Sequence, residues 1–237
     1  MTADSDALHQ LSHGKRSDRL RLDTQLPAPT VAAMRAVLAN TAQARADRSL
    51  AAMWNATSGE PDLQDAAHAI ALRLWLNRWV CRIAYPKDDV DVFVVSLNEW
   101  AKRWSARLPS RRAPLADLPD DALDALGQAY DDLQRAPASV VRRDRLRRIG
   151  PTAAAKLLFA LRPNGVTPWD RQIAATVGGT TRLHFVAHLT RCRAWASALA
   201  AECASLGVDD LAVYVGRPDS SVAKLIDEWL YLTVTRA

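Results

Sequence analysis

Five arginines lie within residues 142 to 148, directly before an Ile-Gly-Pro sequence and a segment rich in alanine and leucine. They are Arg142, Arg143, Arg145, Arg147 and Arg148. A Pro-Trp-Asp sequence follows that segment, and its Asp170 lies where another helix can begin. Guanidinium groups bind phosphate oxygens through paired hydrogen bonds, and a helix dipole favours negative charge at the first turn. These residues therefore predict a binding site for a polyanion next to a carboxylate with a role in acid–base chemistry.

The composition is typical of a globular protein. The chain has 237 residues, of which 49% are hydrophobic and 24% charged, enough for one large domain or two small ones with a buried core. Only nine glycines and many alanines favour helices over strands. The net charge of +5, carried mainly by arginine, permits a polyanionic partner but does not require one.

The cysteines and the hydropathy pattern argue against several classes of protein. Cys81, Cys192 and Cys203 form neither a CxxC pair nor the spacing of an iron–sulfur or zinc site, so we expect buried thiols and no cofactor. The N-terminal region lacks the apolar core of a secretory signal, and no run reaches the roughly 18 apolar residues of a membrane span. We therefore expect a cytoplasmic protein that does not enter membranes.

Hydrophobic periodicity predicts an all-α fold. Residues 1–27 are polar and charged, so we expect a flexible tail before a single helical domain over residues 28–237. Residues 90–95 are compatible with a strand, but the unbroken polar and apolar pattern after them favours a helix. About nine or ten helices are expected, and the clearest helical segments are 29–54, 63–85, 89–104, 120–135, 151–163, 168–179, 180–207 and 219–235.

The segment from Leu146 to Asp170 resembles the helix-hairpin-helix and catalytic-aspartate region of the DNA glycosylase superfamily that includes endonuclease III and the 8-oxoguanine glycosylases. The resemblance covers about 25 of the 237 residues, and the all-α interpretation of the rest is independent of it. Asp170 falls on the catalytic aspartate, and Thr152 falls on the position of the lysine that some members use. The other matching positions are Leu146, Ile149 and Gly150 in the hairpin, the small residue Ala154, and Pro168 before the aspartate.

The resemblance implies hydrolysis of an N-glycosidic bond in DNA. Breaking that bond develops positive charge on the sugar, which the carboxylate of Asp170 stabilises while it orients or deprotonates a water molecule. Backbone N–H groups after Gly150 are placed to bind phosphate. Trp169 either stacks on an extruded base or fills the core.

Several departures from the family pattern change the expected chemistry. Arg148 replaces the first hairpin glycine and Pro151 removes a backbone donor, so phosphate binding depends more on arginine side chains. Because Thr152 replaces the lysine, we expect simple hydrolysis without a Schiff base. Lys156, one turn later, is a second catalytic candidate and otherwise a snorkelling or ion-paired lysine. We assign DNA contacts to Arg145, Arg147, Arg148, Gly150, Thr152 and Arg171, the residue that follows the aspartate.

Structural alternatives accompany each of these assignments. Asp170 is also suited to cap a helix, and the arginine run to form a solvated basic face. Asn77 and Arg82, which lie among tryptophans, either line the base pocket or support core packing. His184 and His188 are one turn apart, but a partly buried pair is favoured over a metal site because no acidic third ligand has suitable spacing.

The C-terminal segment holds two adjacent carboxylates. Asp227 and Glu228 are expected on different faces of a helix, which argues against a glycosidase with two catalytic carboxylates. Lys224 is expected to form an ion pair with one of them along the helix.

Three functions remain open from the sequence. The first is a DNA glycosylase without lyase activity that removes a damaged or modified base, in repair or in recognition of foreign DNA. The second is a nucleoside hydrolase on the same scaffold, for which no continuous basic stripe is needed. The third is a binding module for nucleic acid or another partner that keeps the hairpin without the chemistry.

Overall fold

The structure is a computed structural model that describes residues 26–39, 44–86, 89–141 and 145–236. The described residues form ten α-helices and one two-stranded antiparallel sheet, which confirms the all-α prediction. Of the predicted tail over residues 1–27, residues 1–25 lie outside the described ranges. In chain order the helices and strands are α1 (Val31–Leu38), α2 (Ala44–Ala56), α3 (Ala66–Arg78), α4 (Val92–Trp104), η1 (Ser105–Arg107), η2 (Leu115–Asp117), α5 (Asp120–Arg135), β1 (Pro137–Val141), β2 (Arg145–Arg148), α6 (Pro151–Leu161), α7 (Arg171–Ala175), α8 (Arg182–Leu206), α9 (Leu211–Tyr214), α10 (Val222–Leu230) and the π-helical turn η4 (Tyr231–Thr235).

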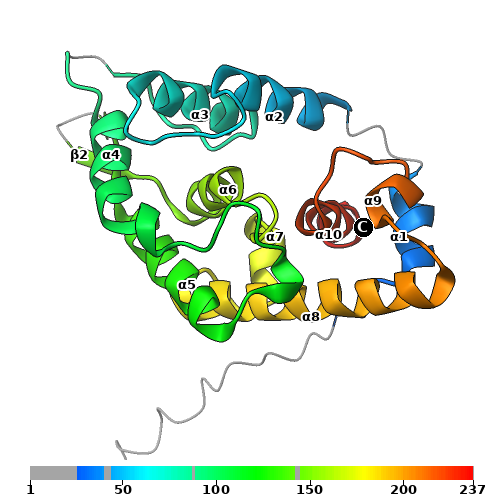
Figure 1. Cartoon of the computed structure of the whole chain (residues 1–237). Helices are drawn as coiled ribbons and strands as arrows, with labels where there is room; N and C mark the ends of the chain where they lie inside the picture. Colours follow the sequence, from blue (N-terminus) through cyan, green and yellow to red (C-terminus); the bar gives the residue numbers. More distant parts are fainter. Residues whose placement is uncertain (1–25, 40–43, 87–88, 142–144, 237) are drawn as a thin grey trace, which may run out of the picture.

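Helix α6 lies in the interior, with the other helices arranged around it (Figure 1). Its residues from 153 to 161 are all buried, as expected for a helix that is apolar on every side. The long helix α8 runs along one edge of the molecule and packs against α5, α10 and α1. Helix α10 is also mostly buried and continues directly into η4. Helix α10 therefore packs against α8 on one side and against α1 on another.

The predicted helices with a clear amphipathic or apolar pattern agree with the structure. Helix α5 spans residues 120 to 135 as predicted, and it buries Leu123, Leu126, Tyr130 and Leu133. Residues 92 to 104 form a helix rather than a strand, and Asp91 caps it by accepting from two backbone N–H groups. Helix α8 ends at Gly207 in the left-handed conformation with φ of 66°, the usual role of a terminal glycine.

Three predicted helices are too long, and one of them, predicted over 168–179, is helical only from Arg171 to Ala175. The segment 29–54 contains two separate helices, since α1 ends at Leu38 and α2 begins at Ala44. Thr30 does cap the first of them, as predicted, by accepting from Ala33 N. The segment 63–85 is helical only from 66 to 78, because the backbone turns at Val80, which has a φ of 63°. The apolar residues beyond Arg78 pack against the core from a loop. Hydrophobic periodicity alone does not distinguish such a loop from another turn of helix.

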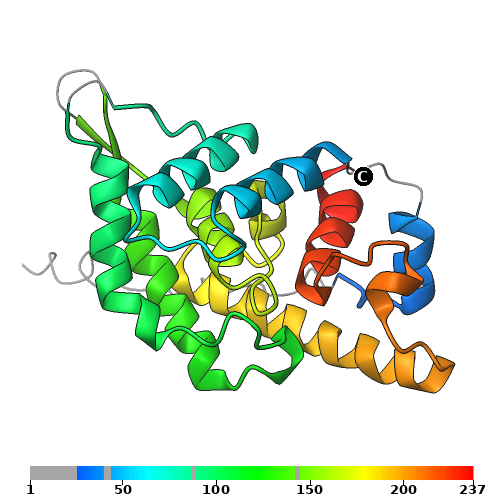
Figure 2. The ribbon, with the colours of Figure 1, turned by 45° about the horizontal axis from the view of Figure 1, so that its top comes forward.

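The described part of the arginine run is a strand, which the all-α prediction did not include. Residues Arg145–Arg148 form β2, which pairs antiparallel with β1. The two strands form a ribbon that projects from the body next to α4 (Figure 2). Its base is closed by hydrogen bonds from Ile149 N to Ala136 O and from Gly150 N to Gln134 O, each 2.9 Å long. Arg142 and Arg143 lie outside the described residues.

Candidate functional site

Asp170 occupies the N-cap of α7, the short helix that follows the loop after α6. Its Oδ1 accepts hydrogen bonds from the backbone N–H of Gln172 at 2.8 Å and of Ile173 at 2.9 Å. Its Oδ2 accepts a third hydrogen bond, 2.8 Å long, from the hydroxyl of Thr235 in η4. The capping role expected as the alternative for Asp170 is therefore present. The three hydrogen bonds also fix a negative charge at one position, partly exposed to solvent.

Trp169 fills the core beside Asp170. Its side chain is 1% exposed and makes edge-on contacts with the rings of Tyr130 and Phe185, whose centroids lie 5.7 and 5.1 Å away. Its Nε1 lies 3.4 Å from the carbonyl oxygen of Pro151, the first residue of α6. In this structure the ring packs in the core and does not line an open base pocket. Through it, the loop before Asp170 is attached to the N-terminal end of α6.

The buried His188 supports the same loop from α8. Its Nε2 lies 3.1 Å from the carbonyl oxygen of Thr167, and burial lowers the pKa of the imidazole to about 3. His184 instead caps the start of α8 together with Thr181. The two histidines thus have separate structural roles. Among the described residues, no group of three or more His, Cys, Asp or Glu side chains is arranged to share a metal ion.

Apart from Arg171, the residues assigned to DNA contacts lie at one end of α6 and on the ribbon. Arg145, Arg147 and Arg148 are exposed on β2. Gly150 has a φ of 80° and precedes α6 without a side-chain cap, and Thr152 lies partly buried in the first turn. This end of α6 therefore presents backbone N–H groups next to exposed guanidinium groups. Arg171, at the start of α7, is also exposed.

Asn77 and Arg82 lie at the loop that leaves α3. The side-chain amide of Asn77 donates to the carbonyl oxygen of Ile83 at 2.8 Å and accepts from its N–H at 2.7 Å. This pair of hydrogen bonds uses the amide to fold the loop, which is a structural role. Arg82 is exposed, with a left-handed φ of 55°.

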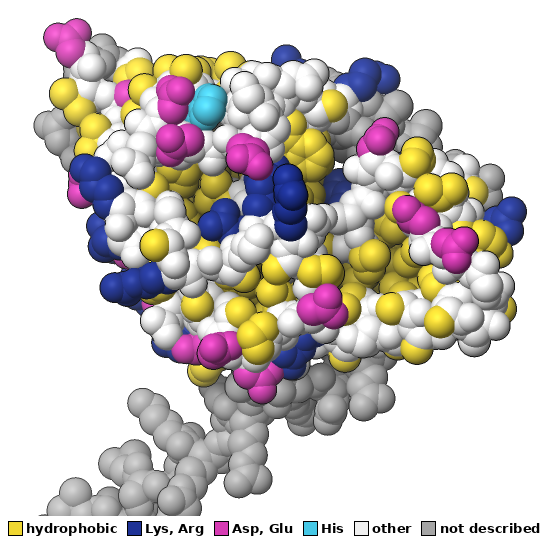
Figure 3. Space-filling view, in the orientation of Figure 1, with side chains coloured by type: hydrophobic (Ala, Val, Ile, Leu, Met, Phe, Trp, Pro, Cys, Tyr) yellow, Lys and Arg dark blue, Asp and Glu magenta, His cyan; other side chains and the backbone are white. Residues whose placement is uncertain are grey.

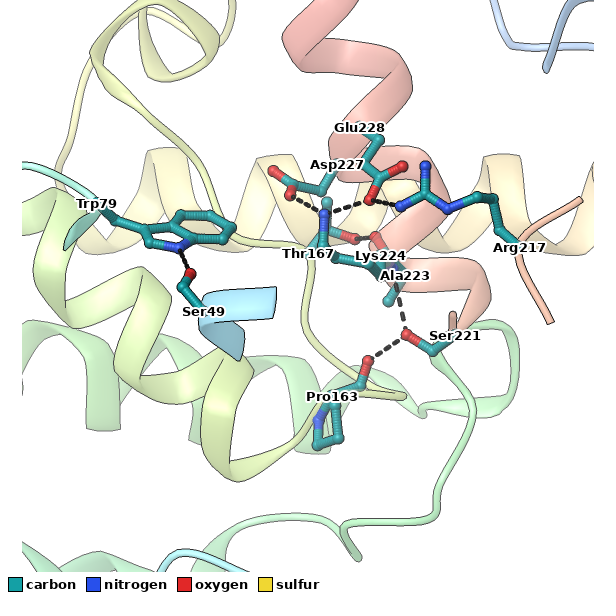
Figure 4. Close-up of polar contacts among 10 residues, drawn as sticks. All are labelled: Ser49, Trp79, Pro163, Thr167, Arg217, Ser221, Ala223, Lys224, Asp227 and Glu228. Carbon is teal, nitrogen blue, oxygen red and sulfur yellow. Dashed lines mark hydrogen bonds and ion pairs between the residues drawn. The ribbon is translucent and has the colours of Figure 1, made fainter. Parts of the chain in front are cut away.

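Lys156 is buried in α6 and faces the end of α3. Its ammonium group donates to the carbonyl oxygen of Trp79 at 3.2 Å and lies 4.7 Å from the centroid of the indole ring. Within the described parts of the chain, no carboxylate lies within ion-pair distance of this ammonium. The expected alternative of an ion-paired lysine therefore does not describe its surroundings. The indole of Trp79 is itself held by a 2.9 Å hydrogen bond to the hydroxyl of Ser49 (Figure 4).

Helix α10 carries a buried cluster of charged side chains that the sequence indicated only in part. The ammonium of Lys224 lies 2.6 Å from Glu228 Oε1 and 3.4 Å from Asp227 Oδ2, so the predicted ion pair is confirmed. The two carboxylates flank this ammonium (Figure 4), which corrects the expectation that they point to different faces. Arg217 adds a second cation, with its Nη2 2.9 Å from Glu228 Oε1. Burial raises the pKa of Asp227 to about 6, although Lys224 and Lys156 lower it.

Hydrogen bonds attach α10 to the loop between α6 and α7. The hydroxyl of Ser221 donates to Pro163 O at 2.6 Å, and the hydroxyl of Thr167 lies 3.4 Å from Ala223 O. The charged cluster and Asp170 are thus positioned by the same loop. Figure 3 shows that the face seen in Figure 1 is hollowed between its two sides, with hydrophobic side chains and Lys or Arg side chains in the hollow.

Sequence reasoning missed Thr235, Arg217 and the burial of the α10 cluster. One signal was present, since the segment Val222–Leu230 places three charged residues in a helix that is otherwise apolar. Charges in such a helix are buried unless it lies on the surface. The contribution of Arg217 depends on tertiary packing and has no local signal.

Comparison with known proteins provides no family for this chain, because no family model, curated protein or solved structure matches it. Within the described residues, no helix combines the length and the apolar character needed to cross a membrane.

Proposed function

We propose that this protein hydrolyses an N-glycosidic bond in DNA, releasing a base with Asp170 as the catalytic carboxylate. The observation that carries the proposal is the fixed position of this carboxylate at the start of α7, where three hydrogen bonds hold it. A preorganised charge costs no rearrangement when positive charge develops on the sugar. The local resemblance over residues 146–170 points to the same reaction.

The carboxylate acts on the sugar and on water. Departure of the base leaves an oxocarbenium-like sugar, and the negative charge of Asp170 stabilises it mainly in the transition state. Water then adds to C1′ and gives up a proton, for which the carboxylate is an acceptor. Thr152 has no amine, so no Schiff base forms at that position and the product is an abasic site in an intact strand.

The surroundings of Asp170 favour DNA over a free nucleoside. The exposed arginines of β2 and the uncapped start of α6 together suit a phosphate backbone. The contact between Trp169 Nε1 and Pro151 O brings the loop of Asp170 next to this end of α6. A DNA strand whose phosphates bind at the β1–β2 ribbon and the start of α6 thus passes near the carboxylate of Asp170.

The test is base release from duplex and single-stranded DNA carrying a panel of modified bases, detected as alkali-sensitive strand cleavage. Asp170→Asn keeps an oxygen for the helix cap and removes the charge, and it is expected to slow release at least about a hundredfold, roughly 2.7 kcal/mol. Asp210→Asn is the matched control, because Asp210 caps α9 with the same pattern of two backbone hydrogen bonds. Its rate should equal that of the wild type.

Four results would change the proposal. Full activity of Asp170→Asn would remove this residue from the mechanism. A borohydride-trapped adduct would indicate an amine nucleophile, with Lys156 as the first candidate. DNA binding without base release from any substrate would indicate a binding module, and release from nucleosides alone would indicate a nucleoside hydrolase.

A further inference from the structure

Lys156 is a buried residue whose ammonium has less than a full set of acceptors among the described residues. The residue is 8% exposed, and the carbonyl oxygen of Trp79 is the one hydrogen-bond acceptor it has among the described residues. An ammonium has three N–H donors, and leaving them unpaired in the interior is costly. A buried lysine of this kind is poised to donate to a ligand.

Lys156 lowers the pKa of Asp227, a carboxylate that is only weakly paired. Lys224 and Arg217 both make their short contacts with Glu228, at 2.6 and 2.9 Å, whereas Lys224 is 3.4 Å from Asp227. Lys156 influences the charge of Asp227 across the cluster. Within the described part of the chain, no hydrogen bond reaches Oδ1 of Asp227. This oxygen therefore remains able to accept from a ligand.

Trp79 lies beside the ammonium groups of Lys156 and Lys224. The centroid of its indole ring is 4.7 Å from the ammonium of Lys156 and 5.8 Å from that of Lys224. Figure 4 shows the indole on the side of Asp227 rather than of Glu228. The side chains of Lys156, Asp227 and Trp79 come from α6, α10 and the end of α3, so they combine a donor, an acceptor and an apolar surface.

We propose that Lys156 and Asp227 together recognise the lactam edge of an oxo-nucleobase. In such an edge a ring C=O lies next to a ring N–H, as in guanine, hypoxanthine, uracil and thymine. Lys156 donates to the carbonyl oxygen, and Oδ1 of Asp227 accepts from the N–H. Adenine and cytosine place an amino donor where Lys156 donates and an unprotonated ring nitrogen where Asp227 accepts, so both contacts fail. The proposal rests on the proposed function, since it treats the hollowed face as the place that receives a base.

Free nucleosides test this recognition apart from catalysis and from DNA binding. Binding of inosine, 1-methylinosine, adenosine, uridine and cytidine to the full chain is measured by calorimetry and by tryptophan fluorescence. Inosine should bind at least about tenfold more tightly than adenosine and uridine more tightly than cytidine, because each lost hydrogen bond to a charged group changes affinity by about that factor. The methyl group of 1-methylinosine blocks the N–H, so this ligand should lose about tenfold relative to inosine.

Variants assign the two roles. Asp227→Asn, whose amide both donates and accepts, should reduce the inosine preference over adenosine to within about threefold. Lys156→Met should weaken inosine more than adenosine. Asp219→Asn is the control, since Asp219 is exposed in the loop before α10. Circular dichroism verifies that each variant is folded.

The outcomes separate this proposal from the proposed function. Equal binding of inosine, 1-methylinosine and adenosine by the wild type, or no nucleoside binding at all, overturns the lactam assignment even if DNA bases are released. Asp170→Asn should keep the inosine preference, because Asp170 is not part of the recognition. If base release is absent but the preference is present, the catalytic role of Asp170 fails and the recognition role of Lys156 and Asp227 holds.

Discussion

The hydroxyl of Thr235 donates a 2.8 Å hydrogen bond to Oδ2 of Asp170, although 65 residues separate the two in the chain. This bond joins the start of α7 to the turn that continues α10. Because backbone N–H groups of α7 donate to Oδ1 of Asp170, Thr235 is the side chain that fixes Oδ2.

Replacing Thr235 by Val removes this donor and leaves the cap of α7 intact. We expect the free energy of unfolding to fall by about 1.5–3 kcal/mol, the range for a hydrogen bond to a charged group. Base release should slow by less than about tenfold, because the charge of Asp170 remains. Urea unfolding and release rates measure the two effects, and Thr235→Ser should restore both. A Val variant as inactive as Asp170→Asn would contradict a mainly electrostatic role.

Replacing Arg147 and Arg148 together by Ala tests phosphate binding by the ribbon. The slope of log affinity for duplex DNA against log salt should decrease in magnitude by about 1.8, since each phosphate contact contributes about 0.9. Arg103→Ala with Arg135→Ala is the control pair, because these exposed arginines are paired with Asp132 and Asp131. An unchanged slope in the β2 variant would identify the arginines as a solvated surface.

His188 should make the fold sensitive to acid. Its pKa is lowered to about 3 by burial first and by Arg191 second, whereas an unfolded histidine titrates near 6.5. The unfolded chain therefore binds the extra proton below pH 6.5, and stability is lost as the pH falls. The contribution of this residue between pH 7.5 and 4.5 is about 2.7 kcal/mol. The difference in unfolding free energy between wild type and His188→Gln should shrink by about that amount over this range; a constant difference would show that His188 does not titrate as proposed.

Substitutions of Trp169 test whether its side chain serves core packing or base stacking. Trp169→Ala should cost about 3–5 kcal/mol of stability, as for other large buried aromatic residues. Trp169→Phe keeps much of the packing against Tyr130 and Phe185 and loses the contact with Pro151 O, so about 1–2 kcal/mol is expected. Thermal and urea unfolding measure both. A Phe variant with unchanged stability and strongly reduced base release would instead favour stacking on the substrate.

The sequence predicts the helices whose burial follows a local period. Residues 120–135 are correct in full because one face is acidic and the other apolar. The end of α3 at Arg78 was missed, since Trp79, Cys81 and Ile83 are also apolar and pack from a loop. Periodicity reports which residues are buried, and it does not report where the backbone turns.

The β1–β2 ribbon and the charged cluster of α10 show a second limit of structure prediction from the sequence. Arg145–Arg148 is a strand because it pairs with Pro137–Val141, and a charged run has no strand pattern of its own. Asp170 was predicted at a helix start from Pro168 and is found there. Its partner Thr235 and the link between Arg217 and Glu228 are long-range contacts, which depend on how α10 packs and not on neighbouring residues.

The closed base of the β1–β2 ribbon makes it a separable part of the protein. Because Ile149 N and Gly150 N bond to Ala136 O and Gln134 O, the chain leaves α5 and returns to α6 at neighbouring points. Ribbons of other length or charge fit this junction without moving the helices below it. Substitutions confined to β1 and β2 thus change the charge that the ribbon presents while the helices that position Asp170 stay the same, and grafting of a different ribbon in the laboratory has the same freedom.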